Sequence, residues 1–172
     1  MAFSKIKNRF LKHKLTRDLA LQPSSRTIDE KKIHTVGIIT TDDFSSSLPI
    51  VEKLNSRIHC IRNIHMLSYR EYDPNEEKSY KHFTSKDINW QGKINNASLA
   101  NFIDTPFDLL IGLFDEKQVY LEYAVLKSEA TFKVGVGKVN DALFDMVINE
   151  NRNQIDSYIQ EVYKYAKILN KV

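Results

Sequence analysis

Cysteine is almost absent from this 172-residue chain, in which Cys60 is the single thiol. One cysteine cannot form an intramolecular disulfide, and neither a CxxC pair nor a Cys/His metal spacing occurs. Cys60 lies in the apolar-rich run RIHCIRNIHML, which favours a role as a small core residue. A disulfide-stabilised scaffold and a cysteine-based zinc site are therefore excluded.

Long apolar runs are missing as well. None approaches the roughly 18 residues of a membrane span. Charges interrupt the N-terminal stretch FLKHKLTRDLAL, which is untypical of a secretory signal. Glycine and proline are scarce, with five and four residues, while 42% of the chain is hydrophobic and 27% is charged. This composition predicts a soluble, cytoplasmic protein with a substantial core.

Common catalytic signatures are also lacking. The sequence contains no GxSxG or HExxH pattern. The run KVGVGK at 133–138 has Gly-x-Gly-Lys, but it lacks the Walker spacing and the following Ser or Thr. We therefore expect a non-catalytic binding protein with no cofactor and no metal.

After residue 28, β-branched and apolar runs alternate with stretches of helical periodicity. Strands are predicted at 33–41, 60–69, 80–84, 107–114, 131–137 and 144–149, and helices at 48–58, 96–103, 117–130 and 155–169. This alternation predicts an α/β fold: a single three-layer Rossmann-like or flavodoxin-like domain with a mostly parallel sheet. The stripe of the last helix that should face the sheet comprises Ile155, Ile159, Val162, Ala166 and Leu169.

Acids and hydroxyls follow the first predicted strand in TTDDFSSS, residues 40–47. In an open parallel sheet, ligands bind beyond the carboxyl ends of the strands. The candidate ligand rim at these ends comprises Thr41, Asp42, Asp43, Ser45, Asp115 and Lys138. Because a helix N-terminus also attracts carboxylates, two readings remain open. The rim is either structural, or it is the nucleotide or sugar-phosphate site of an enzyme or sensor.

The first 17 residues contain no acid. Residues 1–34 hold nine Lys/Arg and three Asp/Glu, whereas the remaining residues hold sixteen and nineteen. A basic helix is predicted over 3–21, and QPSSRT at 22–27 forms a break after it. We therefore divide the chain into a basic helix with its linker, 1–27, and an α/β domain, 28–172. The cations of the helix are Lys5, Lys7, Arg9, Lys12, Lys14 and Arg17.

The six cations lie within the first 17 residues, which hold no anion, and like charges repel one another, so this helix calls for an anionic partner. The cations surround the helix, which suits a phosphate-rich groove better than a flat bilayer. We expect RNA or a ribosomal particle to bind here, with an anionic membrane surface or an acidic protein as alternatives. In a purely structural reading, Phe3, Ile6 and Phe10 dock the helix on the domain and the cations are solvated. We also expect residues 1–21 to be separable from the domain.

Residues 69–90 interleave aromatic side chains with cations, a pattern that can stack bases. Nearby acids dilute the positive charge, so we expect these aromatic residues mainly to cover the core. They are Tyr69, Tyr72, Tyr80, Phe83 and Trp90.

Two resemblances add to this reading. The segment FDLLIGLFDEKQVYLEYAVLKSEATFKVGVG, at 107–137, is similar to a βαβ segment of heptosyltransferase-type glycosyltransferases. That resemblance implies a shared Rossmann-like half-fold and transfers no catalytic residue. The basic helix, FTSKDINWQGK at 83–93 and the FDLLI…FKVG core together resemble an uncharacterised bacterial family of small α/β proteins. This second resemblance supports the fold and implies no activity.

Overall fold

The structure is a computed structural model, in which side chains of the first helix are described from residue 6 onward. It describes residues 2–22, 31–43, 49–75, 77, 79–114, 118–150 and 154–172. These residues contain one sheet with the strand order β3-β2-β1-β4-β5-β6, in which every neighbouring pair is parallel. The strands are β1 (Thr35–Thr41), β2 (Asn63–Tyr69), β3 (His82–Phe83), β4 (Leu109–Leu113), β5 (Lys133–Val136) and β6 (Met146–Ile148).

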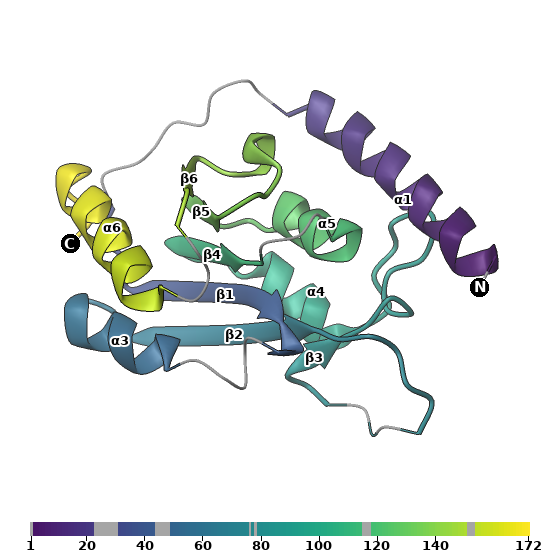
Figure 1. Ribbon diagram of the computed structural model, residues 1–172, viewed down its shortest axis with the longest axis horizontal. Helices are drawn as coiled ribbons and strands as arrows, with labels where there is room; N and C mark the ends of the chain where they lie inside the picture. Colours follow the sequence, from purple (N-terminus) through teal and green to yellow (C-terminus); the bar gives the residue numbers. More distant parts are fainter. Residues whose placement is uncertain are drawn as a thin grey trace.

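This strand order is that of the doubly wound Rossmann fold, and it confirms the predicted α/β class. Helices cover both faces of the sheet (Figure 1). They are α1 (Ala2–Ala20), α3 (Ile50–Arg57), α4 (Ala97–Asp104), α5 (Val119–Lys127) and α6 (Ile155–Ile168), with a 3₁₀ turn, η1 (Asp141–Leu143). Within the described residues, no helix is long and apolar enough to cross a membrane.

Two hydrophobic clusters, one on each face of the sheet, hold these layers together. The first joins α3 and α6 to one face, and the second joins α4, α5 and α1 to the other. All five residues of β4 are buried because helices cover both of its faces. In α6, the predicted stripe is confirmed: Ile155, Ile159, Val162 and Ala166 are buried, and Leu169, just after the helix, packs partly against them.

Helix α1 lies against the outer face of α5 (Figure 1). Leu11 and Leu15 are buried in the same cluster as Tyr120 and Tyr123 of α5. The seven residues of α5 from 120 to 126 are all buried because the sheet covers one side and α1 the other. The expectation that residues 1–21 are separable does not fit this burial. The proposed domain boundary at residue 27 lies outside the described residues and stays a prediction.

The docking face of α1 differs from the one expected in the structural reading. Ile6 and Phe10 are 55% and 54% exposed, so they do not dock the helix on the domain. The neighbouring leucine face does so, because its partner is the apolar outer face of α5. On the other face of the sheet, Pro49 precedes α3 as its N-cap.

At the opposite end of the sheet from the candidate rim, Asp108 fixes β1 beside β4. Its carboxylate accepts hydrogen bonds from the backbone N–H groups of His34 and Thr35, at 2.9 and 2.8 Å. The ammonium of Lys31 lies 2.9 Å away. Burial opposes ionisation of Asp108, but these donors outweigh it and lower its pKa to about 2. The starts of the two central strands are therefore held by a buried charge.

Candidate nucleic-acid interface

The loop between β3 and α4 is fixed by hydrogen bonds within itself. Asp87 accepts from the backbone N–H of Thr84 at 2.7 Å and from its hydroxyl at 3.0 Å. Asn89 accepts from the backbone N–H groups of Gln91 and Lys93, at 2.9 and 2.8 Å. Asx-type turns of this kind hold a backbone without help from a regular ladder. The loop therefore presents Trp90, which lies between these turn residues, in a defined position.

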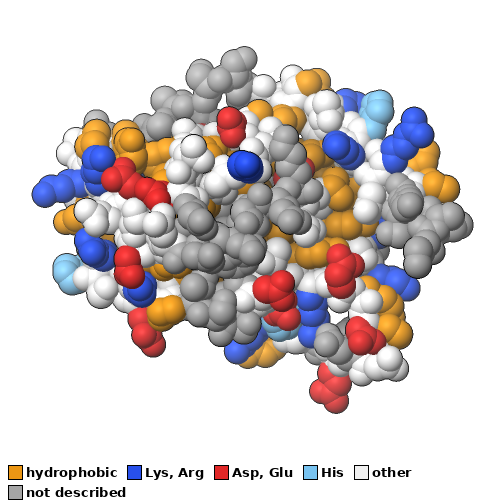
Figure 2. All heavy atoms as spheres, in the orientation of Figure 1, with side chains coloured by type: hydrophobic (Ala, Val, Ile, Leu, Met, Phe, Trp, Pro, Cys, Tyr) orange, Lys and Arg blue, Asp and Glu red, His pale blue; other side chains and the backbone are white. Residues whose placement is uncertain are grey.

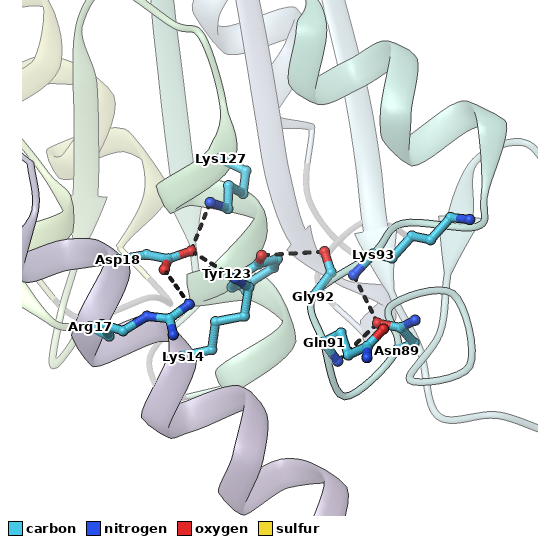
Figure 3. A network of polar contacts seen from close by, with 9 residues as sticks. All are labelled: Lys14, Arg17, Asp18, Asn89, Gln91, Gly92, Lys93, Tyr123 and Lys127. Carbon is cyan, nitrogen blue, oxygen red and sulfur yellow. Dashed lines mark hydrogen bonds and ion pairs between the residues drawn. The ribbon is translucent and has the colours of Figure 1, made fainter.

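Contact with α5 places this loop beside α1. Gly92 has φ +78°, a conformation that favours glycine. The phenol of Tyr123 donates a hydrogen bond to the Gly92 carbonyl at 3.2 Å (Figure 3). A Cβ at position 92 would lie 2.2 Å from that phenol oxygen. A glycine is therefore required where the loop meets α5.

Asp18 holds the carboxyl-terminal half of α1 on α5. Its carboxylate lies 2.8 Å from Lys127 of α5, 3.4 Å from Lys14 and 3.5 Å from Arg17 (Figure 3). Burial opposes ionisation of Asp18, but Lys127 and Lys14 outweigh it and lower its pKa. At 14% exposure this carboxylate is well shielded, so it anchors the helix with a charge-assisted contact.

The amino-terminal half of α1 has its own anchors. The phenol of Tyr120 donates to the side-chain oxygen of Asn8 at 2.6 Å. The ammonium of Lys7 donates to the Ser85 carbonyl and lies 5.5 Å from the centre of the Tyr120 ring. Partial burial lowers the pKa of Lys7. Lys7 therefore contributes to the docking of α1.

A hollow of about 650 Å³ lies between α1 and the Trp90 loop. We call it the basic hollow, and its lining residues are Ile6, Arg9, Phe10, His13, Lys14, Arg17, Trp90 and Gln91. The rings of Phe10 and Trp90 meet edge to face, 5.8 Å between centroids, and each residue is 54% exposed. Figure 2 shows basic and histidine side chains over α1 next to hydrophobic ones. Cations and open aromatic surface thus share one concave site.

The structure distributes the six predicted cations over several positions. Arg9, Lys14 and Arg17 line the basic hollow. Lys12 is exposed and, with Arg9, lines an adjoining hollow of about 380 Å³. Lys7 faces the domain, as described above, and the Lys5 side chain lies outside the described residues. Their contact with RNA stays a prediction.

The expected role of the aromatic stretch is confirmed for two residues and wrong for three. Tyr69 and Phe83 are buried, whereas Tyr72, Tyr80 and Trp90 are 45%, 76% and 54% exposed. Tyr72 and Tyr80 lie in the segment between β2 and β3, and Trp90 lies in the loop after β3, so all three are outside the sheet. Sequence reasoning missed Trp90, Phe10 and His13 as site residues. The turn chemistry of Asn89 and Gly92 on either side of Trp90 was the available signal.

The candidate ligand rim is assembled only in part. Thr41, Asp42 and Asp43 line an open hollow of about 560 Å³ at the carboxyl ends of β1 and β2. Lys138 is exposed beyond β5 and is not among the lining residues of this hollow. Ser45 and Asp115 lie outside the described residues. Among the residues that are described, no group of three or more His, Cys, Asp or Glu could hold a metal.

Ser68, His82 and Asp42 meet at one edge of this rim. The Ser68 hydroxyl lies 2.5 Å from His82 Nδ1, and the Asp42 carboxylate lies 3.2 Å from the same nitrogen. In a nucleophilic triad, the serine and the acid contact opposite ring nitrogens of the histidine. Here both contact Nδ1, so this arrangement lacks the geometry of a triad.

The strand order and the two helical layers define a doubly wound α/β domain, to which α1 adds a docked basic helix. Residues 7–169 match the model of a family of unknown function (DUF6913), and the chain belongs to this family. The match runs from α1 to the end of α6, so it includes both outer helices. Neither a curated protein nor a solved structure matches the chain, and the heptosyltransferase resemblance gains no support.

Proposed function

We propose that this protein is a cytoplasmic RNA-binding protein that takes single-stranded RNA, free or in a particle such as the ribosome, into the basic hollow. The proposal rests on one observation: cationic side chains and exposed aromatic rings line the same concave surface. Arg9, His13 and Arg17 come from α1, and they lie around the exposed pair Phe10 and Trp90.

This combination suits the two parts of a nucleotide. Arginine and lysine attract the phosphates, whose counterions are released on binding. Aromatic rings stack on bases irrespective of sequence, at roughly 1–3 kcal/mol per base. Single-stranded RNA exposes its bases, whereas a duplex hides them in the stack. The proposal is therefore for unpaired RNA with little sequence preference.

The fixed geometry of the hollow also supports binding. Asn89 and Gly92 hold the Trp90 loop, and Asp18 holds α1. Less ordering entropy is lost when a ligand meets groups that already have their bound positions. A concave site fits a strand with projecting bases better than a flat bilayer, which amphipathic helices meet along an exposed apolar face.

Trp90 provides a local probe because it is the single tryptophan of the chain. We expect its fluorescence to fall when a single-stranded RNA of about 12 nucleotides is added at about 50 mM salt. Binding measured by anisotropy of labelled RNA should weaken in Trp90→Ala by roughly 1–3 kcal/mol. In Arg9→Gln/Arg17→Gln, the slope of log affinity against log salt should flatten by about 0.7 per lost phosphate contact.

The matched control changes two exposed lysines of α6, on the other side of the sheet: Lys164→Gln/Lys167→Gln. This variant loses the same charge and should bind RNA as the wild type does. If both double variants lost the same RNA affinity, net charge alone would drive binding, and the basic hollow would not be the RNA site. Binding to anionic vesicles with no response to RNA would identify a membrane-surface protein and overturn the proposal.

A further inference from the structure

The outer edge of β2 is only partly covered by β3. β3 pairs with β2 at two positions, Ser68 with His82 and Tyr69 with Phe83. β2 itself begins at Asn63, so residues 63–67 have no strand on this side among the described residues. In Figure 1, β2 runs along the border of the sheet well beyond the short β3. We call residues 63–67 the open edge.

The hydrogen bonds at the two ends of β2 show which of its backbone N–H and C=O groups face β1 and which face the outer edge. The N–H groups of Ser68 and Arg70 donate toward β3, to the Lys81 and Phe83 carbonyls, at 3.0 Å each. At the other end, the Asn63 N–H donates toward β1, to the His34 carbonyl at 3.2 Å. In a strand, the backbone N–H and C=O groups of successive residues point alternately to the two sides. The N–H and C=O groups of Ile64 and Met66 therefore point outward along the open edge.

A hollow of about 750 Å³ adjoins the open edge. Its walls are α4 on one side and the segment before β3 at one end, and its lining residues are Ile64, His65, Met66, Leu67, Ser68, Tyr80, Lys81, His82, Ser98, Asn101, Phe102 and Thr105. Lys81 is the charged residue of this lining, its other titratable residues are His65, Tyr80 and His82, and His82 faces Asp42 at 3.2 Å. The hollow thus combines outward backbone groups, apolar surface and positive charge.

We propose that the open edge binds an extended acidic peptide segment of a partner protein, which adds to the sheet in line with β3. Unpaired N–H and C=O groups at strand spacing are a template for another strand. Lys81, the charged side chain of the lining, favours Asp or Glu in that segment. Ser98, Asn101 and Thr105 line the α4 side of the hollow, where they can bond polar side chains of the peptide.

A second copy of this chain fits the edge less well. In an antiparallel pair centred on His65, Ser68 of one copy falls opposite Arg62 of the other. β3 lies beside Ser68 on this same edge, so it would meet the turn that precedes β2 in the other copy. A single extended peptide brings no such element.

The test screens a phage-displayed library of linear peptides of about nine residues against the full-length protein. We expect enrichment of sequences in which Asp or Glu alternates with β-branched or aromatic residues. An enriched peptide is then remade with N-methyl groups on alternate residues, which removes the donors facing β2 and leaves the protein unchanged. The peptide whose N-methyl groups replace the N–H groups facing β2 should lose at least tenfold in affinity. The peptide methylated at the other residues, whose N–H groups face away from β2, should bind as before.

Amide hydrogen exchange locates the bound peptide. In the free protein, the Ile64 and Met66 amides should exchange faster than that of Leu67, which points toward β1, and bound peptide should slow them. Met66→Pro, which removes an outward donor, should abolish peptide binding and leave RNA binding unchanged. The proposal is overturned if no acidic peptide is enriched, or if both N-methylated peptides bind alike. A wild-type dimer that Met66→Pro converts to a monomer would make the occupant a second copy and also overturn it.

Discussion

Helices α1 and α6 are both outer helices, one on each side of the sheet, and they use their apolar residues differently. α6 buries a single stripe, with Ile159 and Val162 at its centre. Its exposed large hydrophobic residues are Tyr165 and Ile168, in its last turn. α1 carries two apolar faces, of which Leu11 and Leu15 are buried while Ile6 and Phe10 remain open.

This difference distinguishes apolar residues that pack against the domain from apolar residues that remain available to bind a ligand. A stripe that is wholly buried is explained by the stability it supplies. The second face of α1 has no such explanation, and it lies beside cations and Trp90 in the basic hollow. The comparison shows that α1 has a structural side and an open side, whereas the described contacts of α6 are structural.

The largest expected effects test the structural sides of both helices. Leu11→Ala and Ile159→Ala each remove a fully buried side chain, so each should lower the free energy of unfolding by roughly 2–5 kcal/mol. Urea unfolding followed by circular dichroism measures both losses. If Leu11→Ala cost less than about 1 kcal/mol while Ile159→Ala kept its full cost, α1 would be a separable appendage after all.

A moderate effect is expected from Gly92→Ala, which disturbs the link between the loop and α5. The positive φ costs about 1–2 kcal/mol for a residue with a Cβ, and the contact with Tyr123 would be disrupted. RNA affinity should fall although every cation and Trp90 are retained. Normal RNA binding by a destabilised Gly92→Ala protein would show that the loop position is irrelevant to the site.

The smallest effect on stability is expected on the open side of α1. Ile6→Ala and Phe10→Ala remove exposed side chains, so each should change the free energy of unfolding by no more than about 0.5 kcal/mol. Phe10→Ala should nevertheless weaken RNA binding, because its ring forms part of the stacking surface. A large stability loss with intact RNA binding would place Phe10 among the packing residues and remove the contrast with α6.

Local patterns account for most of the elements. The β-branched and apolar runs indicated the strands, and the stripe of α6 appeared directly in its 3.6-residue period. The excess of cations in α1 was likewise visible without any structure. These features were predictable because each depends on residues close together in the chain.

Tertiary structure decided which residues of α1 are open and where the sites lie. Two neighbouring apolar faces are equivalent in the sequence, and only the outer surface of α5 selects Leu11 and Leu15 for burial. The position of Trp90 depends on a contact between Gly92 and Tyr123, and the open edge of β2 depends on how late along β2 the pairing with β3 begins. Contacts between distant segments leave no periodic trace in a single sequence, so they are settled only when the chain packs.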